Sequence, residues 1–122
     1  MRWAYVNSLC NELRQRVTYL PSRRVESVYV GGGTPSLLSA DEWTCIWDTI
    51  RSTYDIAANA EITVELNPDD VTVAYAQMLR ALGVNRVSMG VQTFDDALLR
   101  LLNRRHTAQG ALAAYDALQR AG

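Results

Sequence analysis

Four segments of the sequence contain groups that could bind a small polar ligand. The three consecutive glycines of residues 31–35 (GGGTP) expose backbone N–H and C=O groups that can bind an amino-acid-like or phosphate-like group. Glu65 could accept hydrogen bonds from an ammonium group or from ribose hydroxyls, and Gln92 can both donate and accept them. Arg104 could bind a carboxylate. These are the candidate ligand-binding residues.

Each of these groups also has an ordinary structural explanation. A glycine turn can be turn chemistry alone, a carboxylate at a strand end can pair with an arginine, and an arginine-rich loop is commonly solvated. The dinucleotide fingerprint GxGxxG would need glycine where Ser36 stands, and the Gly-Lys-Ser/Thr of a P-loop is absent. His106, the only histidine, is interpreted as structural rather than as a catalytic residue or heme ligand. With no Ser-His-Asp set, carboxylate pair or metal-ligand cluster, no catalytic or metal-binding residue is assigned.

Predicted strands lead directly into three of the candidate segments. Residues 25–30 (VESVYV) form a β-branched and aromatic run that ends at the glycine turn. Residues 61–66 alternate strictly between polar and apolar side chains and end at Asn67-Pro68, and residues 86–91 form a third strand before Gln92. In parallel α/β folds ligands bind at the carboxyl ends of strands, so we expect the three segments to converge on one mouth.

Helices are predicted between and around these strands. Apolar residues at three- and four-residue steps predict a first helix over 5–20, ended by Pro21, and Ser39 with Glu42 forms a capping box that starts the second. Thr72 and Gly83 are suited to begin and end the third helix, and a short fourth helix covers about 95–103. Thr107 caps the last helix, whose predicted buried face is Ala111, Leu112, Tyr115 and Leu118.

The order of elements predicts an α/β fold with parallel strand–helix repeats, about three strands and five helices. One face of the second and third strands is apolar and the other carries polar residues such as Glu65, Ser88 and Gln92. A polar face of this kind favours the inside of a barrel near its ligand-binding mouth over an open, doubly wound sheet. We expect residues 1–122 to form a single domain.

The composition excludes several function classes. The chain has 122 residues, 48% of them hydrophobic, and its 12 basic and 13 acidic residues give a net charge of -1. A nucleic-acid binder or a polybasic membrane patch would need an excess of positive charge, and no apolar run approaches the roughly 18 residues of a membrane span. We therefore expect a cytoplasmic protein with no nucleic-acid partner. Cys10 and Cys45 are far apart in sequence and lack CxxC spacing, so they predict neither a disulfide framework nor a cysteine-rich metal site.

Three long motifs carry a specific resemblance. The segments are VYVGGGTPSLLS at 28–39, EITVELNP at 61–68 and GVNRVSMGVQTF at 83–94. In this order they resemble the oxygen-independent coproporphyrinogen III oxidase family of radical S-adenosyl-L-methionine (SAM) proteins, which includes the heme chaperones. The resemblance runs from about Tyr5 to the end of the chain.

This resemblance implies part of a (βα)6 TIM-like barrel that holds SAM and a 4Fe-4S cluster. In the family the cluster reduces SAM to a 5′-deoxyadenosyl radical, and in the oxidases this radical starts the conversion of porphyrinogen propionates to vinyl groups. By motif position, Gly32, Gly33 and Thr34 would contact the methionine end of SAM, and Glu65 would also belong to the SAM site. Gln92 would approach the ribose, and Arg104 the carboxylate region.

The sequence departs from the family at the cluster motif. It has neither the CxxxCxxC loop nor the strand before it, and Cys10 and Cys45 lie on predicted helices where they cannot substitute. We therefore expect a fragment truncated at both ends, inactive alone and weak in binding SAM, whose exposed sheet edges favour dimerisation. We expect the parent to convert coproporphyrinogen III propionates to vinyl groups as an oxidase, and a heme chaperone of the same family is the alternative. The RRHT sequence at 104–107 is more similar to the chaperone branch.

Overall fold

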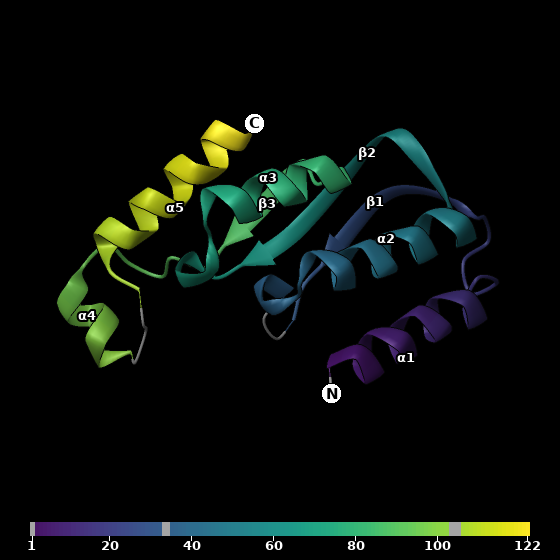
Figure 1. Ribbon diagram of the computed structural model, residues 1–122, viewed down its shortest axis with the longest axis horizontal. Coiled ribbons are helices and arrows are strands. Elements are labelled where there is room, and N and C mark those ends of the chain that lie inside the picture. Colours follow the sequence, from purple (N-terminus) through teal and green to yellow (C-terminus); the bar gives the residue numbers. More distant parts are fainter. Residues whose placement is uncertain (1, 33–34, 103–105) are drawn as a thin grey trace. The chain divides into compact units, whose positions relative to one another are not determined.

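The computed structural model describes residues 2–32, 35–102 and 106–122 (Figure 1). The chain divides into two compact units, Met1–Val28 with Leu38–Ile62 and Tyr29–Leu37 with Thr63–Gly122. The elements in chain order are α1 (Arg2–Gln15), β1 (Arg24–Val30), η1 (Pro35–Leu37), α2 (Ala40–Thr53), β2 (Asp55–Leu66), η2 (Pro68–Asp70), α3 (Val73–Leu82), β3 (Arg86–Met89), α4 (Asp96–Leu101) and α5 (Ala108–Ala121). Here η marks a short 3-10 helix.

The three strands form one sheet in the order β1-β2-β3. Strands β2 and β3 are parallel, with Thr63 opposite Arg86 and Leu66 opposite Met89. Within the described ranges the chain therefore has three strands and five α-helices, as the sequence predicts. Strand β2 begins six residues earlier than expected, because residues 55–60 continue the extended backbone ahead of the alternating segment.

In the first unit α1 lies alongside α2, and the core forms between these helices and the strands (Figure 1). The capping box at the start of α2 is confirmed: Glu42 N donates to Ser39 Oγ at 3.2 Å, and Ser39 N donates to Glu42 Oε1 at 2.9 Å. The buried hydrophobic residues of this unit are Val6, Cys10, Trp43, Ile46, Trp47, Ile50, Ala57, Ala60 and Ile62.

The expected first helix is wrong at its C-terminal end. Helix α1 stops at Gln15, and Tyr19 N donates to the carbonyl of Arg16 in a turn. Tyr19 is 77% exposed and does not extend the buried face of the helix. The β-branched residues at 17 and 18 weaken the helix, and Pro21 biases its predecessor toward extended backbone, so the chain leaves the helix before the proline.

In the second unit α3 packs against α5. The Thr72 side chain accepts a hydrogen bond from Tyr75 N, and Gly83 ends α3 with a left-handed φ of 106°. Both caps agree with the sequence prediction. The buried hydrophobic residues here are Val64, Leu66, Ala76, Leu79, Val84, Leu99, Ala111, Ala114 and Ala117.

The predicted buried face of the last helix is partly wrong. Helix α5 begins after Thr107 as expected, but it buries a stripe of alanines, whereas Leu112 is 57% exposed and Tyr115 58% exposed. Small side chains allow α5 to approach α3 and η2 closely, so the alanine stripe faces them although it is less apolar than the leucine and tyrosine positions.

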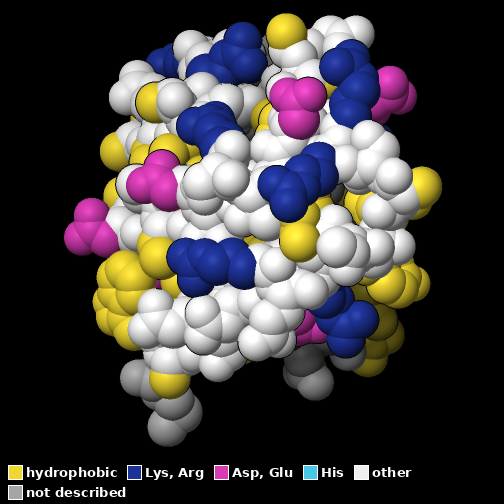
Figure 2. All heavy atoms as spheres, turned by 90° about the vertical axis from the view of Figure 1, so that its right-hand side faces the viewer, with side chains coloured by type: hydrophobic (Ala, Val, Ile, Leu, Met, Phe, Trp, Pro, Cys, Tyr) yellow, Lys and Arg dark blue, Asp and Glu magenta, His cyan; other side chains and the backbone are white. Residues whose placement is uncertain are grey.

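The surface carries charges of both signs. All basic side chains apart from the histidine are arginines, and on the face drawn in Figure 2 they stand among apolar and acidic groups. Among the described residues no helix has both the length and the apolar character that a membrane crossing requires.

Candidate functional site

The candidate site is built around Glu65, which lies near the carboxyl end of β2. Alternation along the strand buries Ile62, Val64 and Leu66 on one face and leaves Glu65 half-buried on the other. Its neighbour across the sheet is Ser88 of β3. The strand thus presents a carboxylate at the end of a parallel sheet, where ligands of α/β folds bind.

Two donors hold the Glu65 carboxylate. The Tyr29 hydroxyl of β1 donates to Oε1, and the backbone N–H of Gly32 donates to Oε2 at 3.2 Å. The Tyr29 hydrogen bond, followed by that of Gly32, holds the pKa of Glu65 below its ordinary value. The same hydrogen bond to Glu65 raises the pKa of Tyr29. At neutral pH Glu65 is therefore an oriented anion beside a neutral tyrosine.

The first two glycines of the turn have different physical roles. A Cβ on Gly31 would lie 2.7 Å from Tyr29 Cε1 and 2.9 Å from Glu65 Oε1, so glycine makes room for the Tyr29–Glu65 pair. Gly32 has a left-handed φ of 77°, and among the described residues other than its chain neighbours no atom lies within 4 Å of the position of its Cβ. The Cα of Gly32 is therefore uncovered by the described residues while its N–H is held by Glu65, whereas Gly31 is covered by the protein's own side chains.

Gln92 follows β3 with an unusual backbone. Its φ of 71° is the only positive value among the described non-glycine residues. This backbone conformation is uncommon for residues other than glycine, and it persists where the neighbouring structure holds it. The adjacent Val91 carbonyl accepts a hydrogen bond of 2.7 Å from His106 Nε2. Because β3 pairs with β2 in parallel, Gln92 belongs to the same end of the sheet as Glu65.

The buried side chain of His106 therefore has a structural partner. A carbonyl oxygen only accepts, so Nε2 must carry the proton in this contact. The bond joins the segment before α5 to the segment after β3, and it supports the structural interpretation of this histidine.

The structure brings some predicted site residues together directly. Gly32 and Glu65 are in hydrogen-bond contact, and Gln92 lies beyond the neighbouring strand. The predicted residues Gly33, Thr34 and Arg104 lie outside the described residues.

Sequence reasoning missed Tyr29. The only local signal was its position at the carboxyl end of a predicted strand, directly before the glycine turn. A tyrosine hydroxyl on the polar face of β1 is within reach of a carboxylate on the next strand. That strand pairing is not visible in the sequence alone.

The residues present do not fit an iron–sulfur cluster. Among residues 2–32, 35–102 and 106–122, no group of three or more histidine, cysteine or acidic side chains could hold a metal ion. Cys10 and Cys45 belong to α1 and α2 of the first unit, whereas Glu65 belongs to the second.

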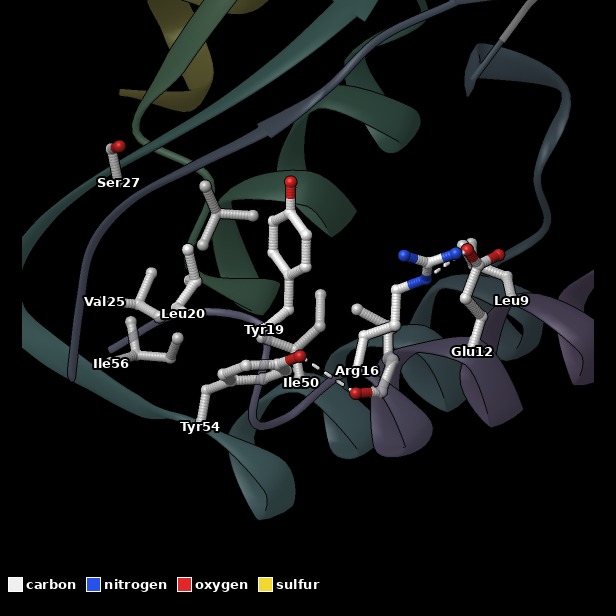
Figure 3. A pocket seen from close by; sticks show the side chains of 12 residues that line it. Leu9, Glu12, Arg16, Tyr19, Leu20, Val25, Ser27, Ile50, Tyr54 and Ile56 are labelled. Carbon is white, nitrogen blue, oxygen red and sulfur yellow. Dashed lines mark hydrogen bonds and ion pairs between the residues drawn. The ribbon is translucent and has the colours of Figure 1, made fainter. Parts of the chain in front are cut away.

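A separate pocket of about 460 Å³ lies in the first unit (Figure 3). Most of its wall is apolar, including Leu9, Ile50 and Ile56, and Tyr54 donates to the Leu13 carbonyl at its edge, at 2.9 Å. All residues lining it belong to the first unit, so this pocket is distinct from the Glu65 site.

Strands that alternate with helices, and polar residues at the carboxyl ends of the strands, define an α/β protein. The chain belongs to the Radical SAM superfamily, whose family model matches residues 2–122. This finding confirms the fold class and the resemblance drawn from the three motifs.

Individual relatives narrow the resemblance. The chain is 42% identical over 110 residues to the heme chaperone HemW of Escherichia coli (strain K12), covering 90% of this chain and 29% of that protein. It is 32% identical over 120 residues to the oxygen-independent coproporphyrinogen III oxidase of Bradyrhizobium diazoefficiens, covering 98% and 27%. The chain therefore spans about three tenths of the length of these curated relatives.

Solved structures agree with the fold. The coproporphyrinogen III oxidase HemN from Escherichia coli, described as a radical SAM enzyme, superposes with a TM-score of 0.81 and 30% identity over 97% of this chain and 28% of that one. The archaeal Elp3 of Methanocaldococcus infernus superposes with a TM-score of 0.68 over 87% of this chain and 30% of that one; at 17% identity it shows the fold alone.

Proposed function

We propose that this chain supplies part of the SAM-binding site of a radical SAM protein that handles a porphyrinogen or heme. The observation that carries the proposal is the Glu65 carboxylate, which Tyr29 and Gly32 hold at the end of β2. We also propose that residues 1–122 form part of a single barrel domain. Membership of the Radical SAM superfamily supports both statements.

A carboxylate acceptor suits SAM, whose ammonium group and ribose hydroxyls can donate hydrogen bonds. The lowered pKa of Glu65 keeps its carboxylate ionised at neutral pH, so it accepts hydrogen bonds from either group. By motif position Gly32, Gly33 and Thr34 bind the methionine end, Gln92 the ribose and Arg104 the carboxylate. When bound and reduced, SAM supplies a 5′-deoxyadenosyl radical. Glu65 orients the ligand and takes no proton from it.

The cluster that reduces SAM in this superfamily does not fit the residues described. The chain alone is accordingly proposed to be inactive and to bind SAM weakly. Calorimetry that finds micromolar SAM binding by the isolated chain would contradict this part of the proposal.

The role of Glu65 can be tested in the full-length protein that carries this chain. Glu65→Gln keeps the size of the side chain and removes the charge, so we expect SAM affinity to fall at least about tenfold, since charge-assisted hydrogen bonds are the strong ones. Glu26→Gln is the matched control, because Glu26 is an exposed carboxylate on β1. Equal SAM affinities for both variants would refute the assignment.

Of the two activities considered, the heme chaperone has the stronger support. The identities to heme chaperones range from 31% to 42% and include the 32% identity to a coproporphyrinogen III oxidase, so the RRHT sequence at 104–107 is the feature that favours the chaperone. We expect the full-length protein, reconstituted and reduced, to bind heme and transfer it stoichiometrically without decarboxylating coproporphyrinogen III. Formation of vinyl product with consumption of SAM would instead establish the oxidase.

A further inference from the structure

We propose that Cys10 and Cys45 form an oxidation-sensitive pair, in which a peroxide links α1 to α2 through a reversible disulfide. Although 35 residues separate them, their sulfur atoms lie 3.9 Å apart. Cys10 Sγ also lies 3.8 Å from the carbonyl oxygen of Cys45. Both cysteines are free thiols in this structure.

The gap between the sulfur atoms is small enough to close. A disulfide bond is about 2.05 Å long, so each sulfur must move by roughly 1 Å. Rotation about the Cα–Cβ bonds, with a small shift of the helices, would provide this movement. The backbone does not have to unfold first.

The packing of α1 on α2 keeps the two cysteines opposite each other. One helical turn beyond the Cys10–Cys45 contact, Arg14 Nη2 donates to Thr49 Oγ1 at 3.4 Å, again across 35 residues. The Tyr54 hydroxyl just beyond α2 donates to the Leu13 carbonyl at 2.9 Å. A constant offset over successive turns means that the helices run parallel in a fixed register, side by side as in Figure 1.

The two thiols differ in access. Cys10 is only 2% exposed, whereas Cys45 is half-buried, so the oxidant reaches Cys45 first. Burial, and then the hydrogen bond with Cys10, raises the pKa of the Cys45 thiol. Little of it is thiolate at neutral pH, so the pair responds to sustained oxidation rather than to brief exposure.

The reaction balances with hydrogen peroxide as oxidant. The Cys45 thiolate attacks one peroxide oxygen, the O–O bond breaks, and hydroxide leaves to give a sulfenic acid. The Cys10 thiolate then attacks Cys45 Sγ, forms the S–S bond and displaces the second hydroxide. Two thiols lose two electrons and two protons in total, and the peroxide becomes two water molecules.

The experiment treats the purified full chain with hydrogen peroxide, blocks remaining thiols and maps the peptides by mass spectrometry. We expect an intramolecular Cys10–Cys45 peptide, a thermal midpoint about 10 °C higher, and reversal of both by dithiothreitol. Cys10→Ser and Cys45→Ser should each lack the linked peptide and the thermal shift.

Wild-type chain oxidised in concentrated urea provides a control that does not depend on how the variants fold. A smaller share of the oxidised Cys45 should end in the Cys10–Cys45 link there, and a larger share in sulfinic acid or in links between copies, because the packed helices no longer hold the sulfur atoms together. Equal shares with and without urea would overturn the proposal. So would, in the folded chain, thiols that stay free, a link between two copies, or conversion of Cys45 to a sulfinic acid.

Discussion

Replacing Gly31 with alanine should displace the Glu65 carboxylate while leaving the fold intact. The added Cβ would lie 2.9 Å from Glu65 Oε1 and 2.7 Å from Tyr29 Cε1. Non-bonded carbon atoms are most stable at about 3.5–4.0 Å, so the carboxylate must retreat by roughly 0.5–1 Å. Gly31 is not in the left-handed region, so alanine fits its backbone.

The displacement should appear in the pKa of Glu65. Its hydrogen bond from Gly32 N is already 3.2 Å long, at the upper end for N–H···O, and the Tyr29 ring must turn as well. With both donors weakened, the pKa of Glu65 rises toward its ordinary value of about 4.3. Because the pKa of Glu65 is lower in the folded chain than in the unfolded chain, its ionised carboxylate stabilises the fold above the unfolded pKa. This stabilisation is lost as pH falls through the folded pKa. Gly31→Ala should therefore lose less stability than the wild type between neutral and acidic pH.

Gly32→Ala is the matched control, with the opposite physical effect. No described side chain lies within 4 Å of its Cβ position, so none of these is displaced, but its φ of 77° strains an alanine backbone by about 1–2 kcal/mol. We expect a lower free energy of unfolding by that amount and an unchanged pKa of Glu65.

Carbon-13 NMR of the glutamate carboxyl groups across the acidic range measures the pKa, and urea unfolding measures the stability. The two variants should separate the effects: Gly31→Ala changes mainly the pKa and Gly32→Ala mainly the free energy. An unchanged Glu65 pKa in Gly31→Ala would refute the explanation of why residue 31 is glycine.

Substitutions at four other positions test neighbouring features. Tyr29→Phe should raise the pKa of Glu65 toward its ordinary value, and in Glu65→Gln the pKa of Tyr29 should return toward about 10, both followed by NMR titration. Ser39→Ala removes the cap of α2 and should lower the free energy of unfolding by about 1 kcal/mol in urea; an unchanged midpoint would contradict the cap. His106→Ala leaves the Val91 carbonyl without its donor, so urea unfolding should show a loss of about 1–3 kcal/mol, and His106→Gln should recover part of it.

Much of the fold is predictable because its signals are local. The Ser39–Glu42 box, the Thr72 cap and the left-handed Gly83 each depend on residues within a few positions of one another. The end of α1 depends on competing local signals, because the β-branched residues at 17 and 18 and Pro21 oppose the apolar periodicity. The buried face of α5 is not predictable locally: it is decided by what the helix packs against, and α5 buries alanines because close approach outweighs greater apolar area.

The sequence by itself determined the order of strands and helices, the helix caps, the superfamily resemblance and the position of Glu65 at a strand end. Only the tertiary structure decided which distant groups meet: Tyr29 with Glu65 across 36 residues, and Cys10 with Cys45 across 35. The physical reason is how far apart along the chain the interacting groups are. Caps and strand alternation come from neighbours along the chain, whereas these two contacts require parallel elements to pack side by side in one particular register.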